Sequence, residues 1–455
     1  MKVDLSLVRK YNVAGPRYTS YPPANHFTDQ VPYDTILNEI RENNVTPGDL
    51  SLYFHIPFCQ TLCWYCGCNT VITKKQCQSA TYLGYLEKQM DLMAQMLHPG
   101  RKVVQLHFGG GTPTFLTPDE IRQLGASIRS RFQFAPDIEA GVEIDPRRLC
   151  TDHIRALRES GFNRISLGIQ DHNPEVQKAV NRIQPKEQTE QVVRWIREAG
   201  FQSLSIDLIY GLPHQTVASF EKTLDEVIEL DPDRLAVFSY AHVPWIKPAQ
   251  KLLQTEFLPN AETKFQLLKL SIEKLTARGY VYIGMDHFAK ATDELAIAQQ
   301  RHTLQRNFQG YSTRAGADIY GFGNSSISQA DGIYWQNQKD LQQFYGSLDT
   351  GHHPLSHGYV LTDEDRVRRT TIMRLMCDMG LDFGYMSRLL HVDFARHFAD
   401  ELESLEDLEA DGLLERTSSG VTVTETGRLL IRNIAMRFDA YLPKAAVAGV
   451  YSRTI

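Results

Sequence analysis

The stretch SLYFHIPFCQTLCWYCGCN, residues 51–69, joins a short apolar run to a loop that is dense in cysteine. The run 51–56, bounded by proline, predicts a β-strand. The loop carries four cysteines within ten positions, and the rest of the 455-residue chain carries three: the four are Cys59, Cys63, Cys66 and Cys68. In parallel α/β folds, the loops that follow the carboxyl ends of strands carry the chemistry, so this stretch links the fold to a site.

The chain after this loop repeats the same order of strand and helix. Further apolar runs occur at 103–108, 140–145, 164–170, 204–211, 234–242 and 280–288. Helical periodicity occurs at 80–97, 118–132, 150–161, 187–200 and 260–279. Strands joined by helices pair in parallel, so the pattern predicts a complete or partial (β/α) barrel, with an open doubly wound sheet as the alternative.

The two ends of the chain differ from this α/β pattern. GPRYTSYPP (15–23) is too rich in proline for regular structure, and GLLERTSSGVTVTETGRLLI (412–431) predicts a hairpin between helices. We therefore expect three parts: an N-terminal extension covering the active site (1–50), a catalytic barrel (51–350) and a mainly helical, winged-helix-like domain (351–455).

Composition and charge argue against membrane association, export and nucleic-acid binding. With 42% hydrophobic and 22% charged residues and no apolar run near the ~20 residues that span a bilayer, no membrane association is expected. The N-terminus lacks a signal-peptide core, which predicts a cytoplasmic protein. A net charge of −6 and the acidic segment 400–412 argue against nucleic-acid binding, because phosphate contacts need lysine and arginine.

The cysteine spacing favours an iron–sulfur cluster. A disulfide framework is improbable in a chain without export signals, and a four-cysteine zinc site usually separates two cysteine pairs by a long excursion. Three thiolates on one loop suit a cubane cluster, because each binds a different iron. At the ends of later strands, Glu143, Gln170 and Asp207 are placed to face a central ligand, although solvated loop residues or helix caps remain the alternative.

The segment CQTLCWYC resembles the signature of the radical S-adenosylmethionine (SAM) superfamily, with Tyr65 as its aromatic residue. The resemblance implies that Cys59, Cys63 and Cys66 hold a [4Fe–4S] cluster and that SAM binds its open iron. Reduction of that SAM would release a 5′-deoxyadenosyl radical. The fourth thiol, Cys68, would then compete with SAM as a ligand, so we expect it to act in catalysis.

Further segments resemble the oxygen-independent coproporphyrinogen III oxidases, also called coproporphyrinogen dehydrogenases, over almost the whole chain. These segments are GPRYTSYP, HFGGGTPT, VEIDPR, GFNRISLGIQD, IDLIYGLPHQT, GMDHFA and RNFQGYST. The resemblance implies oxidative decarboxylation of two propionates of coproporphyrinogen III to vinyl groups, giving protoporphyrinogen IX in haem biosynthesis.

The same resemblance implies two SAM molecules per chain. The contacts of the cluster-bound molecule would be Tyr53, Gly110, Glu143, Ala241 and Ile327. Those of the second would be Tyr65, Gly111, Thr112, Gln170, Arg182 and Asp207. Arg182 would meet a carboxylate, Asp207 would accept hydrogen bonds from ribose hydroxyls, and Arg17 is a candidate anchor for substrate propionates. We expect a monomer that receives electrons from a flavodoxin-type protein.

Three other functions compete with this interpretation. A radical SAM haem chaperone or a haem-modifying relative would share the cysteine loop, but these typically lack GPRYTSYP and the CGC that ends at Cys68. An iron–sulfur, redox-sensing DNA-binding regulator would account for the cysteines and the winged helix. It would not account for seven strand-and-helix units with polar strand ends.

Overall fold

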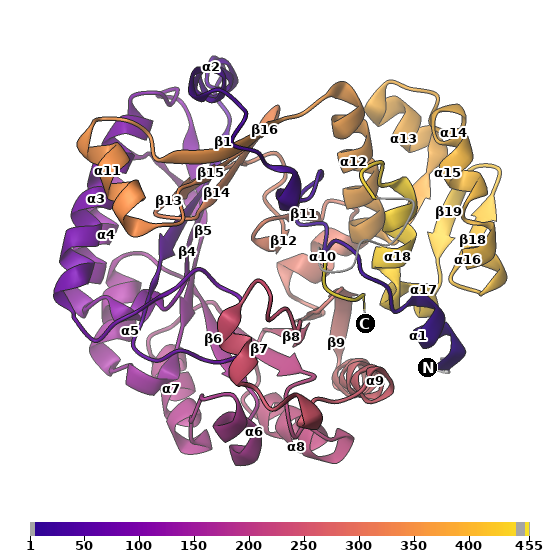
Figure 1. The fold of residues 1–455 in the computed structure, drawn as a ribbon, viewed down its shortest axis with the longest axis horizontal. Helices are drawn as coiled ribbons and strands as arrows, with labels where there is room; N and C mark the ends of the chain where they lie inside the picture. Colours follow the sequence, from indigo (N-terminus) through magenta and orange to yellow (C-terminus); the bar gives the residue numbers. More distant parts are fainter. Residues whose placement is uncertain (1–4, 443–450, 455) are drawn as a thin grey trace.

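The protein is built around a single large β-sheet (Figure 1). The computed structural model describes residues 5–442 and 451–454, so the outermost parts of the expected terminal domains, 1–4, 443–450 and 455, lie outside the described residues. The sheet has 12 strands in the order β16-β15-β14-β13-β1-β4-β5-β6-β7-β8-β10-β9.

Seven neighbouring strands of this sheet run parallel. They are β1 (Asp49–Ile56), β4 (Lys102–Gly110), β5 (Phe134–Ile144), β6 (Arg164–Gln170), β7 (Ser203–Tyr210), β8 (Arg234–Ser239) and β13 (Asp318–Phe322). Across the part of the chain that the structure describes, the two edge strands do not pair with each other. The sheet is therefore a partial barrel, one of the two predicted forms.

Helices follow the parallel strands along the chain and lie along the outer face of the sheet (Figure 1). They are α3 (Cys77–Ala94), α4 (Pro118–Arg131), α5 (Thr151–Glu159), α6 (Pro174–Ala179), α7 (Lys186–Glu198), α8 (Val217–Ile228) and α9 (Ala261–Ala277). All five predicted helices are present, whereas α6 and α8 were not predicted. Phe54 and Phe322 stack with ring centroids 4.8 Å apart, and their apolar contact holds β1 beside β13.

The run 280–288, predicted as one strand, contributes to two strands in the structure. The structure forms a hairpin of β9 (Tyr280–Gly284) and β10 (His287–Lys290), and β10 pairs antiparallel with β8. Gly284 at φ 144° and Met285 at φ 53° turn the chain, so one continuous apolar run divides into two strands. The α10 helix (Glu294–Gln300) and the short hairpin of β11 (Gln305–Asn307) and β12 (Gly310–Ser312) follow.

The other edge of the sheet was not predicted. It consists of β14 (Ile327–Ala330), β15 (Ile333–Asn337) and β16 (Leu355–Val360), with α11 (Leu341–Asp349) between the last two. These strands pair antiparallel and extend the sheet beyond β13.

The C-terminal part is mainly helical around a three-stranded sheet with the order β17-β19-β18, as expected for a winged-helix-like domain. Its elements are α12 (Asp363–Asp378), β17 (Gly380–Asp382), α13 (Phe383–Leu390), α14 (Phe394–His397), α15 (Ala399–Glu403), α16 (Glu406–Ala410), β18 (Leu414–Thr417), β19 (Gly420–Val423), α17 (Glu425–Leu429) and α18 (Ile431–Ala435). The segment 412–431 forms the predicted hairpin.

The N-terminal extension packs against this C-terminal part. It contains α1 (Leu5–Tyr11) and α2 (Tyr33–Asn43), and the intervening 12–23 forms neither helix nor strand, as its prolines predict. Tyr11, Tyr18 and Tyr21 are buried in the C-terminal hydrophobic core. Over residues 5–442 and 451–454, no helix is long and apolar enough to cross a membrane.

Candidate active site

The cysteine loop leaves the carboxyl end of β1 and is held in place by backbone hydrogen bonds. Its first residues form β2 (Phe58–Cys59), which pairs with β3 (Val71–Ile72). The amide of Cys66 donates to the carbonyl of Cys63 at 3.0 Å, which closes a turn. All four thiols line one cavity of about 290 Å³, which we call the cysteine cavity.

Positive charge surrounds these thiols. The guanidinium groups of Arg147 and Arg182 donate to the Cys63 sulfur at 3.5 and 3.6 Å, and both also pair with Asp145. Burial opposes ionisation of Asp145, but Arg182 and Arg147 outweigh it and lower its pKa to about 2. A hydrogen bond from the Cys68 thiol lowers the pKa of Cys66 to about 6, whereas burial raises that of Cys59 to about 11.

These residues fit a cubane cluster better than a single metal ion. Within the described residues, no three His, Cys, Asp or Glu side chains converge as ligands of one ion. A cubane cluster distributes its thiolates over different irons, so it needs thiols around a shared cavity, and two arginines can stabilise its anionic sulfur. Cys59, Cys63 and Cys66 provide that arrangement.

The glycine loop after β4 packs directly against the cysteine loop. The amides of Gly111 and Thr112 donate to the carbonyls of Ile56 and Phe58 at 2.8 and 3.0 Å. A Cβ at Gly111 would lie 2.5 Å from the carbonyl oxygen of Pro57, and Gly110 has a φ of 112°. These glycines are therefore required by the contact between the two loops.

Four of the five residues predicted for the cluster-bound SAM line a second cavity, of about 610 Å³, which we call the upper cavity: Tyr53, Gly110, Glu143 and Ile327. Glu143 accepts a hydrogen bond from the Gly110 amide at 3.3 Å, and its other oxygen lies 3.3 Å from His107 Nε2. Its carboxylate is thus positioned at the glycine loop, where it can accept from an ammonium group.

The fifth residue, Ala241, lines neither cavity. It follows β8 and lines a third cavity, of about 730 Å³, beyond the carboxyl ends of β7 and β8. Its carbonyl accepts a hydrogen bond from Gln250 at 3.2 Å. Among the residues that the structure describes, the predicted set of cluster-bound SAM contacts is thus divided between two cavities.

All six residues predicted for the second SAM line the cysteine cavity: Tyr65, Gly111, Thr112, Gln170, Arg182 and Asp207. Gln170 ends β6 at a φ of 69°, and its buried Oε1 has no hydrogen-bond partner in the described structure. The buried Nε of Arg182 also lacks a partner there. Such strained and unsatisfied groups are typical of ligand sites.

Asp207 has an unusual charge environment. Burial and the neighbouring Glu143 raise its pKa to about 7, although the Ser166 hydroxyl donates to both of its carboxylate oxygens at 3.0 Å. Arg182 already pairs with Asp145 at 3.1 Å, so its predicted bond to a cofactor carboxylate would add to an existing ion pair.

Cys68 lines both the cysteine cavity and the upper cavity. It is the exposed member of the four, and its carbonyl accepts from Lys247 Nζ at 3.1 Å. A thiol in this position faces the space of both predicted cofactors.

Several residues at the site were not predicted from the sequence. His55 bridges the Tyr53 hydroxyl (3.2 Å) and the Asn69 carbonyl (2.9 Å), and the ring of His107 stacks on Tyr53. Tyr53 and His107 are register partners on β1 and β4. His55 precedes Cys59 by four residues and His107 precedes Gly109 by two, so their places near the ends of two predicted strands were the signal that could have identified both histidines.

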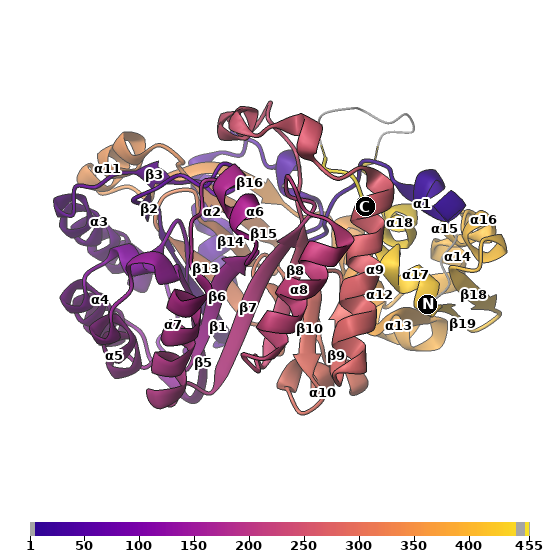
Figure 2. The ribbon, with the colours of Figure 1, turned by 90° about the horizontal axis from the view of Figure 1, so that it is seen from below.

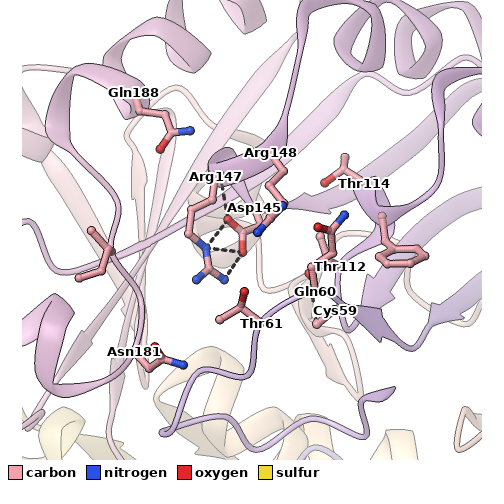
Figure 3. A pocket seen from close by; sticks show the side chains of 12 residues that line it. Cys59, Gln60, Thr61, Thr112, Thr114, Asp145, Arg147, Arg148, Asn181 and Gln188 are labelled. Carbon is pink, nitrogen blue, oxygen red and sulfur yellow. Dashed lines mark hydrogen bonds and ion pairs between the residues drawn. The ribbon is translucent and has the colours of Figure 1, made fainter. Parts of the chain in front are cut away.

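A further pocket of about 370 Å³ opens beside the cysteine cavity (Figure 3). We call it the outer pocket. Cys59 and Thr112 line it on one side, and Asp145, Arg147 and Arg148 on another, with Arg147 directed toward Asp145 in Figure 3. Cys59, a predicted cluster ligand, thus lines both the cysteine cavity and this second opening.

Comparison with known proteins agrees with this geometry. Residues 53–227 match the Radical SAM superfamily, and residues 361–430 match the HemN C-terminal domain. Oxygen-independent coproporphyrinogen III oxidase of Synechocystis sp. is 48% identical over 100% of this chain and 98% of its own length. That of Escherichia coli is 46% identical over 99% and 98%, respectively.

A solved structure, coproporphyrinogen III oxidase (HemN) from Escherichia coli, superimposes with a TM-score of 0.92 at 44% identity, covering 97% of this chain and 100% of its own. The partial barrel and its cysteine loop thus define a radical SAM enzyme, a fold that implies a [4Fe–4S] cluster and SAM. Within that class, the chain belongs to the family of oxygen-independent coproporphyrinogen III oxidases and is an oxidoreductase.

Proposed function

We propose that the protein converts coproporphyrinogen III to protoporphyrinogen IX without oxygen, as a step of haem biosynthesis. Each of two propionates loses a β-hydrogen atom, CO₂ and one electron, and becomes a vinyl group. The main support is that the thiols of Cys59, Cys63 and Cys66 line one cavity together with Glu143 and Asp207. The chain is also 48% identical to a relative named oxygen-independent coproporphyrinogen III oxidase.

Bound cluster and SAM supply one-electron chemistry that begins with a 5′-deoxyadenosyl radical. In this chain, Cys59, Cys63 and Cys66 would hold the cluster, and the backbone of Gly110 with Glu143 would orient the methionine amino group. The protein's main contribution would be to keep bulk water away from the radical and to hold the reacting atoms close together in these cavities.

We further propose that two SAM molecules bind, one in each of the adjoining cavities. The unpartnered Gln170 Oε1 and Arg182 Nε support the second site, because buried polar atoms without partners are rare. Equilibrium binding to iron-loaded protein should give two SAM per chain, and Asp207→Ala should reduce this to one while iron content is unchanged. One SAM per unmutated chain would contradict the second site.

We assign electron entry to the outer pocket. Arg147 and Arg148 line it next to Cys59, so an acidic flavodoxin-type donor would find complementary charge close to a cluster ligand. In this proposal the protein acts in the cytoplasm as a monomer without bound nucleic acid. Its acidic segment 400–412, which forms α15 and α16, does not favour phosphate binding.

An anaerobic assay tests the proposed reaction. Reconstituted protein, SAM, a reductant and coproporphyrinogen III should give protoporphyrinogen IX, and Cys63→Ser should give none. Release of 5′-deoxyadenosine without any change in the tetrapyrrole would contradict the proposed substrate.

A further inference from the structure

A cavity of about 730 Å³ lies beyond the carboxyl ends of β7 and β8, and we call it the basic chamber. Four separate segments of the chain form its walls. They are 12–17 of the N-terminal extension, the connection from β8 to α9 with the start of α9, the strand ends at Gly211 and Ser239, and the C-terminal residues 451–453. Figure 2 shows the chain's C-terminus beside α9, and the β8–α9 connection beyond the ends of those two elements.

The chamber is strongly positive. Arg17, Lys264 and Arg453 line it, and none of its described lining residues is acidic, in a chain of net charge −6. The neighbouring carboxylate is Asp286, which pairs with Arg17. Such a concentration of cations attracts an anionic ligand.

Two more arginines contact the N-terminal segment that lines the chamber. Arg306 donates to the carbonyl of Tyr18 at 3.2 Å, and Arg432 donates to that of Pro16 at 3.0 Å. Burial, together with Arg432, Arg17 and Arg453, lowers the pKa of Lys264 to about 8. A bound carboxylate would offset this repulsion and stabilise the ammonium form.

Apolar side chains also line the chamber. Trp245, Leu258 and Val13 line it, and Trp245 is 57% exposed. A cavity with an indole wall and three cations suits an apolar molecule that carries several carboxylates.

The chamber shares a wall with the reaction site. On the β8–α9 connection, Gln250 donates to the carbonyls of Tyr65 (3.1 Å) and Ala241 (3.2 Å), and Lys247 donates to Cys68. A ligand in the chamber is therefore adjacent to the cysteine loop.

We infer that the basic chamber binds the non-reacting carboxylates of a tetrapyrrole, with Lys264 and Arg453 as positioning residues beside Arg17. That the tetrapyrrole is coproporphyrinogen III rests on the proposed function. Lys264 Nζ, which donates to the Tyr240 carbonyl at 3.2 Å, lies on α9, and Arg453 reaches the chamber from the C-terminus. The C-terminal residues thereby take part in substrate recognition.

Binding of coproporphyrin III, the oxidised and unreactive analogue, to iron-loaded full-length protein tests this inference. We expect Lys264→Gln and Arg453→Gln to weaken binding about tenfold or more, because each removes a charge-assisted hydrogen bond. Lys264→Arg should recover most of the affinity. Lys251→Gln, an exposed lysine of the same connection, should change nothing. The tetramethyl ester of coproporphyrin should bind weakly to every variant.

In turnover assays, the same two substitutions should raise KM more than they lower kcat. The chamber assignment would be overturned if the Lys264→Gln and Arg453→Gln variants bind coproporphyrin III within about twofold of the unmutated protein. It would also be overturned if the ester binds as well as the tetraacid. Either result counts even if the unmutated protein turns over coproporphyrinogen III normally. Conversely, Lys264-dependent porphyrin binding without turnover of coproporphyrinogen III would refute the proposed function and leave the chamber assignment standing. Arg453 is exposed, so its variant reports on the chamber even if Lys264→Gln fails to fold.

Discussion

At the scale of single residues, Cys68 is the thiol for which we predict a role in catalysis and not in cluster binding. It lies two positions beyond Cys66, and its thiol lines both the cysteine cavity and the upper cavity. Three other thiols already suffice for a cluster with one open iron, so Cys68 is available for a second role.

We expect Cys68→Ala to keep its iron and cluster absorbance but to lose at least about tenfold in turnover, because a thiol that takes part in hydrogen or electron transfer has no substitute in alanine. Iron analysis and product quantification check this result. Near-normal turnover would instead show that Cys68 only packs beneath the loop, and loss of iron would make it a ligand.

Asp207 provides a test by pH. Its pKa in the folded protein is about 7, above the ordinary value of 3.8, so the folded state favours the protonated acid. The stability that this preference contributes is complete at pH values below the ordinary pKa and is lost as pH rises through 7.

Asp207→Asn, which cannot ionise, should therefore gain thermal stability over the unmutated protein as pH rises from about 5 to 7, with the difference constant above about pH 8. Melting temperatures of iron-loaded protein without SAM measure it. A pH-independent difference would show that Asp207 is already ionised at pH 5.

The residue scale also shows what the sequence can predict. The spacing of Cys59, Cys63 and Cys66 predicts them as cluster ligands, because such ligands are close along the chain, and the structure brings all three to one cavity. The Asp145–Arg182 pair was not identified, because it joins residues 37 positions apart and depends on where β5 and α6 end. The backbone strain at Gln170 likewise has no signature in its neighbours.

At the scale of elements, the contact between the glycine loop and the cysteine loop determines where the thiols lie. Gly111 donates to Ile56 at 2.8 Å with no space for a side chain, so any added atom must displace the start of the cysteine loop. Five of the connecting helices and six of the seven parallel strands were predictable from their periodicity, whereas α6, α8 and β13 were not predicted. The β9–β10 hairpin was not, because its run of apolar residues has the same composition as a single strand.

Gly111→Ala should lower the free energy of unfolding by about 1–3 kcal/mol and reduce iron retention, through overpacking against Pro57. Gly84→Ala is the matched control, because Gly84 lies within α3 with no atom within 4 Å of an added Cβ. It should stabilise the protein by about 0.5–1 kcal/mol. Chemical denaturation with iron analysis compares the two, and equal iron retention would contradict the account of the loops.

At the scale of the whole molecule, the N-terminal extension joins the barrel to the C-terminal part. Tyr11, Tyr18 and Tyr21 are each no more than 5% exposed in the C-terminal core, and Arg17 reaches the basic chamber. The lack of regular structure at 12–23 was predictable, but this packing was not, because it involves partners about 400 residues away, such as Asp439 for Tyr18.

Deleting residues 1–24 should keep the iron content, lower turnover and destabilise the protein by on the order of 5 kcal/mol, since three buried aromatic side chains are lost. Val45→Ala, at a position that is 73% exposed, should leave stability unchanged. Calorimetry and iron analysis check both proteins, and a truncated protein with full stability and activity would show the extension to be dispensable.

At this scale we propose that three thiols, and not four, hold a [4Fe–4S] cluster whose open iron binds SAM. Mössbauer spectroscopy of ⁵⁷Fe-reconstituted protein tests it most directly. We predict that adding SAM shifts the signal of one iron and leaves the other three unchanged, and that Cys68→Ala gives the same spectra. Four irons that do not respond to SAM, or a spectrum that changes with Cys68→Ala alone, would contradict the claim.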